Sequence, residues 1–248
     1  MKIHGSGQSA VCNLNPAPNV NSSTLCIIPT QARNVVEDPV GLKKKPNVMS
    51  QWLDRLTAAG TSILLVHGEW FDDLRKLAED ARNERDGFTR WLERMEAVVG
   101  HAVAHGYGDP DRFVAMGSSR HGFAALHALA NIPGIAATVA HQPVVWWPRM
   151  TEFDGMDDNA VVRANDLYEM AERFPPRPVL VQTGYDDQRV GQDWIKRLVD
   201  GMSGAYEAAG AGHRFTHEIM DIPGHDGARV PTSALDSVVT WMKDQQLV

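Results

Sequence analysis

The chain has 248 residues, which is enough for one domain with a large buried core. Its 24 Lys and Arg residues against 31 Asp and Glu residues give a formal net charge of -7, and no basic stripe stands out beyond Lys43, Lys44 and Lys45, so a nucleic-acid-binding surface is not expected. The 43% hydrophobic and 22% charged residues argue against a disordered or fibrous chain, and no apolar run approaches the roughly 20 residues of a membrane span.

The first 23 residues are rich in Asn, Ser, Gly and Pro and are expected to form a loose lead-in with room for one short strand. No continuous apolar signal core follows Met1, so a cytoplasmic location is expected. The two cysteines, Cys12 and Cys26, do not make a disulfide framework for a chain of this size.

From residue 24 onward the pattern alternates between buried strands and amphipathic helices. Strands are expected at 25–28, 63–66, 113–116, 135–140, 179–181 and 215–220. Helices are expected at 49–59, 88–99, 123–130, 194–202 and 233–242, whereas 72–86 is a polar, charge-rich stretch. The alternation predicts a single α/β domain over 24–248, with a mostly parallel central sheet and helices on both faces. Residues 144–174 are too many for a tight connection and are expected to form a lobe or lid.

The motif Met116-Gly117-Ser118-Ser119-Arg120-His121-Gly122 lies between an expected strand and an expected helix. In that context a tight turn presents a serine above the carboxyl edge of the sheet, and small neighbours let the helix pass close to the strand. Gly117 and Gly122 flank Ser119 in this way. Two alternatives are that Ser119 is an ordinary helix-capping residue and that Ser118 is the reactive serine.

With these residues the chain resembles the α/β-hydrolase family, especially the esterase branches that are similar to prolyl oligopeptidase and dienelactone hydrolase. The likeness runs from about Leu25 to Met242. It implies the α/β-hydrolase fold, with a lobe inserted before the strand that carries the acid, and the chain order nucleophile, acid, histidine. On this resemblance Ser119 is the nucleophile.

The resemblance also selects an acid and a base. The segment from Gly184 to Val190 looks like the family's acid loop, in the register that selects Asp187, with Asp186 as the competing acid. The pair Gly224-His225 looks like the catalytic histidine loop, and His213 and His217 compete with His225. A histidine is needed to take the serine proton during attack, and a carboxylate orients its imidazole and stabilises the imidazolium.

Two backbone N–H groups are expected to hold the oxyanion of the tetrahedral intermediate. The resemblance assigns the first to Arg120, the residue after the nucleophile. The second belongs to the loop after the strand 25–28, where the family often has His-Gly or a glycine cluster and this chain reads Pro29-Thr30-Gln31-Ala32. Because Pro29 has no N–H, Gln31 is the expected donor and Thr30 is the alternative.

Aromatic residues follow the strand 135–140 at the edge where α/β sheets bind ligands. Trp146 and Trp147 are expected to offer flat apolar walls to the substrate, and the alternative for one of them is an anchor between the lobe and the core. His141 is expected to line the pocket or to make a buried polar contact. An acidic rim that disfavours polyanionic substrates is expected from Glu152, Asp154, Asp157 and Asp158.

Together these features predict a carboxylesterase-like serine hydrolase that cleaves small esters through a Ser-His-Asp triad and an acyl-enzyme intermediate. No phosphate-binding glycine motif is found, and the helical pair His101 and His105 lacks the glutamate of a zinc hydrolase, so no cofactor or metal is expected. A peptidase, an acyltransferase or lyase with the same triad, and a non-catalytic binding protein remain alternatives. The expected partner is a small-molecule ester, with neither nucleic acid nor membrane, and the sequence leaves open whether the chain forms homo-oligomers.

Overall fold

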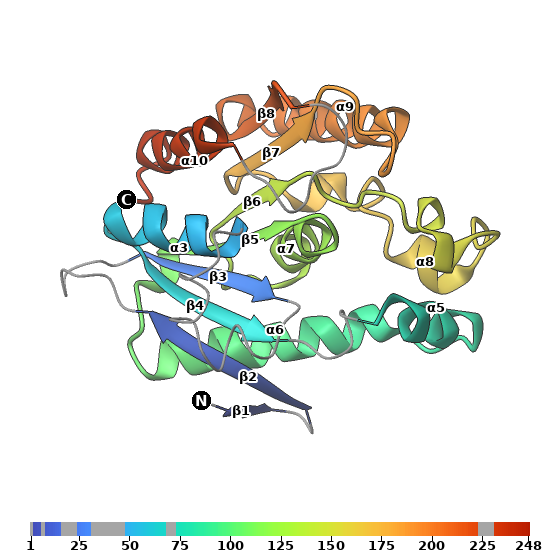
Figure 1. The fold of residues 1–248 in the computed structure, drawn as a ribbon, viewed down its shortest axis with the longest axis horizontal. Coiled ribbons are helices and arrows are strands. Elements are labelled where there is room, and N and C mark those ends of the chain that lie inside the picture. The colour runs from blue at the N-terminus through green and yellow to red at the C-terminus, as the bar shows by residue number, and fades with distance from the viewer. Residues whose placement is uncertain (1, 6–7, 16–23, 31–47, 68–72, 223–230) are drawn as a thin grey trace.

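A computed structural model describes residues 2–5, 8–15, 24–30, 48–67, 73–222 and 231–248 (Figure 1). Its centre is an eight-stranded sheet in the order β1-β2-β4-β3-β5-β6-β7-β8. The strands are β1 (Lys2–Gly5), β2 (Gln8–Asn15), β3 (Leu25–Thr30), β4 (Ser62–His67), β5 (Phe113–Ser118), β6 (Ala137–His141), β7 (Val179–Gly184) and β8 (Phe215–Met220). From β4 to β8 all neighbouring strands are parallel, whereas β2 is antiparallel to both β1 and β4.

The six strands predicted from apolar runs are present, and the mostly parallel sheet is confirmed. The lead-in, for which one short strand was expected, contributes two strands that extend the sheet beyond β4. In β2, Cys12 is buried and Leu14 packs against the same core, while Asn13 and Asn15 alternate with them. This two-residue period is that of a strand with one face on the core, although polar residues dilute the apolar signal.

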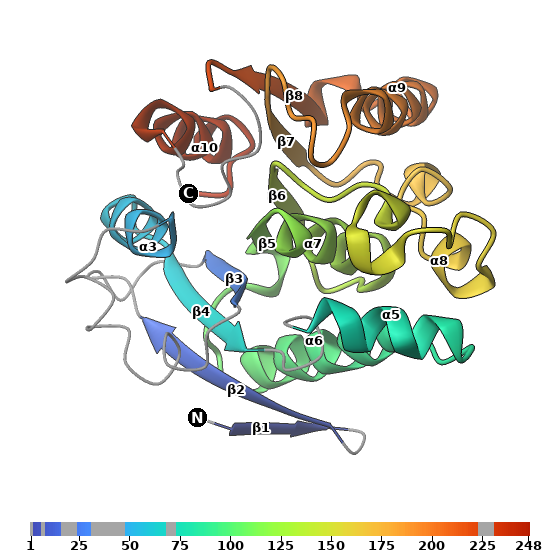
Figure 2. The same cartoon turned by 45° about the vertical axis from the view of Figure 1, so that its right-hand side comes forward.

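Helices cover both faces of the sheet (Figure 2). They are α3 (Val48–Ala58), α5 (Leu74–Arg82), α6 (Gly87–Ala104), α7 (Arg120–Asn131), α8 (Ala160–Ala164), α9 (Gln192–Ala208) and α10 (Thr232–Asp244). One face packs against α3 and α10 through a core that includes Trp52, Leu180 and Trp241. The other packs against α6, α7 and α9 through a larger core that includes Phe88 and Phe123. Among the described residues no helix combines the length and hydropathy needed to cross a bilayer.

The helix α5 lies in the stretch 72–86, for which no helix was predicted. Its buried side chains are Leu77, Ala78, Asp80 and Ala81, so only a narrow apolar stripe faces the protein. Asp73 caps its N-terminus, because the carboxylate accepts a hydrogen bond from the backbone N–H of Lys76 at 3.1 Å. The remaining residues are mostly charged, which hides the helical period from a reading based on hydrophobicity.

The segment between β6 and β7 forms the expected lobe from short helical turns. These are α8 and three 3-10 turns, at Trp147–Arg149, Thr151–Phe153 and Ala171–Arg173. The lobe and α5 lie beyond the carboxyl ends of the parallel strands, as Figure 1 shows. Ligand sites of open α/β sheets form at this edge.

Candidate active site

Ser119 occupies the tight turn between β5 and α7. Its backbone angles are φ 57° and ψ -123°, a conformation that residues with a side chain rarely adopt. Although Ser119 stands at the N-cap position of α7, its side chain makes no capping hydrogen bond. The structure therefore does not support the capping alternative, and strained backbone of this kind concentrates at functional sites.

Glycines allow the close approach of helix and strand around Ser119. A Cβ atom on Gly117 would lie 2.1 Å from the backbone oxygen of His121, which no real side chain tolerates. A Cβ atom on Gly122 would lie 3.1 Å from the Cα atom of Pro143, in the loop that follows β6. The Gly-x-Ser spacing seen in the sequence thus has a packing cause in this fold.

The loop after β6 holds the backbone of Ser119 in place. The N–H of Ser119 donates to the carbonyl oxygen of His141 at 2.9 Å. The carbonyl oxygen of Ser119 accepts from the N–H of Val144 at 3.0 Å and from the N–H of Phe123 at 3.2 Å. These hydrogen bonds fix the unusual backbone conformation from both sides.

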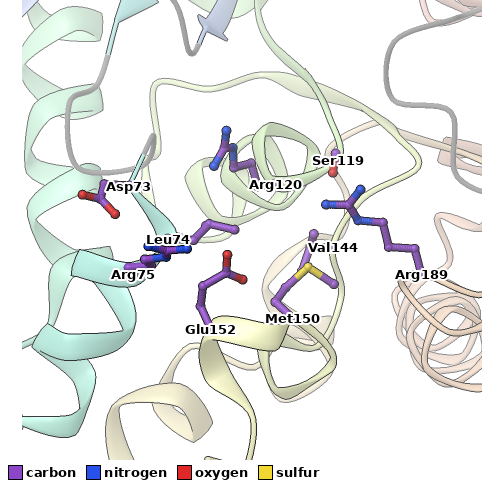
Figure 3. A pocket seen from close by; sticks show the side chains of 9 residues that line it. All are labelled: Asp73, Leu74, Arg75, Ser119, Arg120, Val144, Met150, Glu152 and Arg189. Atoms are coloured by element: carbon purple, nitrogen blue, oxygen red, sulfur yellow. The ribbon is translucent and has the colours of Figure 1, made fainter.

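Ser119 lines a cavity of about 540 Å³ at the carboxyl edge of the sheet (Figure 3). Its walls come from α5, the Ser119 turn, the lobe and the loop after β7. The lining residues among those described are Asp73, Leu74, Arg75, Ser119, Arg120, Val144, Met150, Glu152 and Arg189. A serine at the base of such a concave site can meet a small molecule.

The two candidate acids differ in burial and in hydrogen bonding. Asp187 follows β7 and has an exposed fraction of 0%. Its Oδ1 accepts from the backbone N–H groups of Arg189 and Val190, each at 3.2 Å. Asp186 is exposed, and its carboxylate accepts from the side-chain amide of Gln188. A buried, backbone-held carboxylate is suited to orient a histidine, so the geometry favours Asp187.

The predicted base His225 and the predicted oxyanion donor Gln31 lie outside the described residues. Residue 31 follows directly after β3, which pairs with β5. After β8 the chain runs beside the acid loop, since the N–H of Tyr185 donates to the carbonyl oxygen of Ile222 at 3.2 Å.

The competing histidines are placed differently. His213 is exposed in a 3-10 turn that precedes β8, which is the amino end of a parallel strand and the edge opposite to Ser119. His217 lies within β8, where its Nε2 is 2.9 Å from Oγ1 of Thr183. Burial lowers the pKa of His217, which disfavours its charged form. Neither position suits a base that must reach Ser119.

Arg120 is the first residue of α7, so its backbone N–H belongs to the N-terminal turn of a helix. The N–H groups of this turn have no partner within the helix, and the helix dipole favours negative charge beside them. Its side chain reaches the cavity next to Ser119. The position is that expected for the first oxyanion donor.

Trp146, Trp147 and His141, which were predicted to bind the substrate, are not among the described residues that line the cavity. Trp147 is 1% exposed and packs against Phe88 and Phe123, with ring centroids 5.2 Å and 4.9 Å away. It anchors the lobe to the core because this burial removes its large apolar surface from water. Trp146 is 6% exposed and stacks on Trp194 at 4.9 Å.

His141 is the third of these residues. Its side chain is 0% exposed and lies on the sheet face that packs against α3, where its ring meets Trp52 edge-on at 6.4 Å. Its Nδ1 is 3.3 Å from Oε1 of Gln182, whose amide nitrogen donates to Glu218 at 2.8 Å. His141 thus makes the buried polar contact that was the alternative, and it supports Ser119 through its backbone oxygen.

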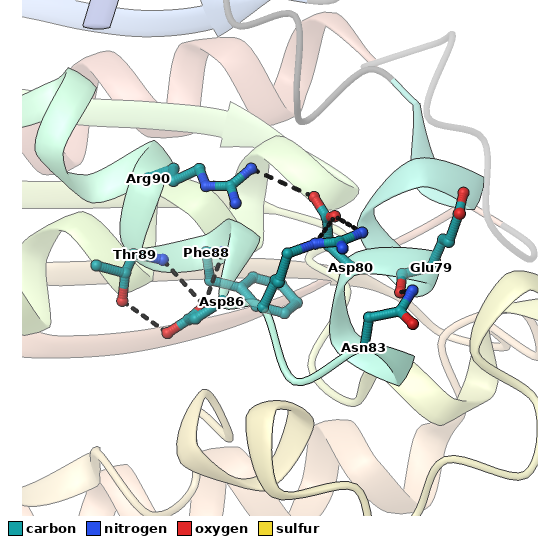
Figure 4. Close-up of polar contacts among 8 residues, drawn as sticks. Glu79, Asp80, Asn83, Asp86, Phe88, Thr89 and Arg90 are labelled. Carbon is teal, nitrogen blue, oxygen red and sulfur yellow. Dashed lines mark hydrogen bonds and ion pairs between the residues drawn. The ribbon is translucent and has the colours of Figure 1, made fainter. Parts of the chain in front are cut away.

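The contribution of α5 to the cavity was not predicted from the sequence. Figure 4 shows how polar contacts join α5 to α6. The buried carboxylate of Asp80 accepts from Nε of Arg85 at 2.7 Å and from Nη1 of Arg90 at 3.4 Å. Asp86 caps α6 by accepting from the N–H of Phe88 at 2.9 Å. The acidic residues at 73, 80 and 86 therefore have defined structural partners in a segment that reads as merely charged.

The same helix is joined to the lobe. Nη2 of Arg82 donates to the carbonyl oxygen of Glu152 at 2.6 Å, and the side-chain amide of Asn159 donates to the carbonyl oxygen of Ala81 at 3.0 Å. Two walls of the cavity, α5 and the lobe, are thereby connected to each other. Their relative position is set by hydrogen bonds between backbone and side chains.

Comparison with solved structures finds the same architecture in proteins of low sequence similarity. Est1E from Butyrivibrio proteoclasticus aligns with a TM-score of 0.69 and 16% identity, over 100% of this chain and 99% of that chain. A cold-adapted esterase from an Arctic intertidal metagenomic library aligns at 0.67 and 16%, over 98% and 92%. Acylaminoacyl peptidase from Pyrococcus horikoshii aligns at 0.67 and 13%, over 99% of this chain but 40% of that one.

The chain has the α/β-hydrolase fold. No family model matches the sequence, and no curated protein matches it either. Within the α/β-hydrolase fold, Ser119 stands on the turn between the strand β5 and the helix α7, and Asp187 stands in the loop after β7. The fold alone does not fix the reaction.

Proposed function

We propose that the protein is a serine hydrolase that cleaves carboxylic esters of small molecules. The observation that carries the proposal is the conformation of Ser119: a positive φ on the turn between strand and helix, with no capping bond, at the wall of a cavity. The α/β-hydrolase fold of the esterases that align with this chain supports it. The burial of Asp187 in the loop after β7 and the position of Arg120 in the first turn of α7 support their roles as carboxylate and N–H donor.

In the proposed reaction Oγ of Ser119 attacks the ester carbonyl while His225 accepts its proton. Asp187 holds the imidazole and stabilises its charged form. The backbone N–H groups of Arg120 and Gln31 bind the oxyanion of the tetrahedral intermediate. The intermediate expels the alcohol, which takes the proton from His225 and leaves an acyl-enzyme. Water then attacks the acyl group, again with His225 as base, and releases the acid and free Ser119.

Labelling with a fluorophosphonate probe tests the proposal. The native protein is expected to be modified at Ser119 and to hydrolyse para-nitrophenyl acetate. Ser119→Ala is expected to lose the label and at least about 1,000-fold in kcat/KM, because no other group forms the acyl-enzyme. Absence of labelling in the native protein would instead identify a non-catalytic binding protein.

Ser118→Ala is the matched control. The Oγ of Ser118 is buried and has no hydrogen-bond partner among the described residues, so its removal is expected to leave folding and labelling intact. Loss of the label in this variant, with retention in Ser119→Ala, overturns the assignment of the nucleophile. The melting temperature of each variant shows whether it is folded.

A further inference from the structure

The cavity at Ser119 is polar rather than lipid-like. Five of its nine described lining residues carry a charge, namely Asp73, Arg75, Arg120, Glu152 and Arg189. Among the described lining residues the apolar ones are Leu74, Val144 and Met150, and the last two are almost completely buried. A long acyl chain therefore finds little apolar surface here, and a compact polar substrate fits the site better.

The charge of the described cavity lining differs in sign from that of the whole chain. Among the described lining residues, three arginines and two carboxylates leave a surplus of one positive charge, whereas the chain has a formal net charge of -7. One of the carboxylates, Asp73, also caps α5. Of the four residues expected to form an acidic rim, only Glu152 is found among the lining residues. The prediction of an acidic rim is corrected accordingly.

One of the arginines lies beside the nucleophile. The side chain of Arg189 reaches towards Ser119 from the acid loop, as Figure 3 shows, whereas that of Arg120 points away from Ser119. In the part of the chain that the structure describes, the guanidinium of Arg189 forms no ion pair. The backbone of Arg189 is fixed independently by its N–H bond to Asp187 at 3.2 Å. An anion on the substrate could therefore be held close to the reacting carbonyl.

We propose that Arg189 binds a carboxylate on the substrate, so that the preferred substrates are small esters with one negative charge, such as half esters of dicarboxylic acids. This inference rests on the proposed function. Guanidinium groups recognise carboxylates through paired charge-assisted hydrogen bonds. Hydrolysis of a half ester with water yields the dicarboxylic acid and the alcohol, and the bound carboxylate takes no part in the bond changes.

A matched pair of substrates tests the preference. The para-nitrophenyl half ester of glutaric acid is an anion, and its methyl ester is neutral with the same carbon chain and leaving group. The native protein is expected to favour the anion by about tenfold in kcat/KM, the size of one partly exposed charged hydrogen bond. Salt is expected to weaken the preference. Equal kcat/KM values for the two esters overturn the inference.

Variants assign the preference to the arginine. Arg189→Gln keeps the backbone N–H that binds Asp187 and is expected to abolish the preference through a higher KM for the anion. Arg189→Lys, which keeps the charge without the planar fork, is expected to restore part of it. Arg163→Gln removes a positive charge on the lobe, where Arg163 is paired with Asp158 at 3.3 Å, and is expected to keep the preference. An Arg189→Gln variant that still favours the anion overturns the inference.

Binding separates this inference from the proposed function. In Ser119→Ala, which cannot turn over the ester, the half ester is expected to bind more tightly than its methyl ester by about tenfold in Kd. Adding Arg189→Gln is expected to remove that difference. If the native protein is neither labelled nor active, the proposed hydrolase function fails while this measurement still decides the carboxylate site. Equal Kd values for the two esters overturn the site even if hydrolysis is observed.

Discussion

The backbone oxygen of His121 lies so close to Gly117 that a Cβ atom on residue 117 would be 2.1 Å away. This contact brings the end of β5 against the first turn of α7. Ser119 lies between the two, in the tight turn that connects them. Because the neighbour is backbone rather than the end of a flexible side chain, the helix would have to move to make room.

Gly117→Ala is therefore expected to lower the free energy of unfolding by about 3 kcal/mol or more, as overpacking against backbone does, and to abolish labelling of Ser119. Gly100→Ala is the matched control. No heavy atom lies within 4 Å of a Cβ at this exposed position in α6. Because alanine favours the helix more than glycine does, the change is expected to raise the free energy of unfolding by about 1 kcal/mol. Urea denaturation measures both, and equal effects would show that the contact at 117 is unimportant.

The positive φ of Ser119 predicts a cost to stability. Ser119→Gly is expected to be about 1 kcal/mol more stable than Ser119→Ala, because glycine adopts a φ of 57° without strain. Both variants lack the hydroxyl, so hydrolysis is expected to be lost in both. Comparison of their urea denaturation midpoints measures the cost of the positive φ at residue 119. A glycine variant less stable than the alanine variant would contradict the presence of strain.

The two adjacent aspartates are expected to respond very differently to amidation. Asp187→Asn keeps an oxygen for the N–H groups of Arg189 and Val190 but favours the wrong tautomer of the base, so kcat is expected to fall by about 1,000-fold or more. Asp186→Asn alters an exposed side chain and is expected to change kcat less than about twofold. Reversal of this order in a para-nitrophenyl ester assay would assign the acid to Asp186.

His127 is expected to make the free energy of unfolding depend on pH. It is packed against Phe123 and Phe88, and burial lowers its pKa from 6.5 to about 4, while Asp86 acts weakly in the opposite direction. Between about pH 6.5 and pH 4 the unfolded chain binds this proton and the folded chain does not. The free energy of unfolding is therefore expected to fall as the pH decreases through that window, by up to about 3 kcal/mol.

His127→Phe provides the comparison for this effect. Phenylalanine fills the same aromatic cluster without a titrating group, so the variant is expected to lose less stability between pH 7 and pH 4.5 than the native protein. Urea denaturation at the two pH values measures the difference. Equal losses would place the acid sensitivity on other groups.

The inner parallel strands β4, β5, β6 and β7 could be predicted because their residues are almost all buried on both faces, which leaves an apolar run such as Ile63 to Val66. In the sequence of β2, Cys12 and Leu14 alternate with asparagines, so the strand has no uninterrupted apolar run and its signal is weak. The helix α5 was missed for a related reason. It is recognisable only once the partners of Asp73 and Asp80 are known.

The candidate site divides in the same way. Ser119 and Asp187 follow from a short motif and from loops in a fixed order, which depend on local chain geometry. The lining of the cavity depends on how distant segments meet. The sequence assigned Trp147 to a wall of the pocket, but whether a tryptophan after a strand faces a pocket or the core is decided by Phe88 and Phe123, which come from other helices. Arg75 and Arg189 gave no sequence signal for the same reason.

The connection of α5 to the lobe through Arg82 and Asn159 has an evolutionary consequence. Hydrogen bonds join α5 and the lobe, which form walls of the cavity, to each other. The turn that carries Ser119 is held separately, by backbone hydrogen bonds to His141 and Val144. Substitutions in the walls can therefore change which substrate binds without disturbing the turn that carries Ser119. This separation lets related proteins evolve new substrate specificities through changes confined to the cavity walls.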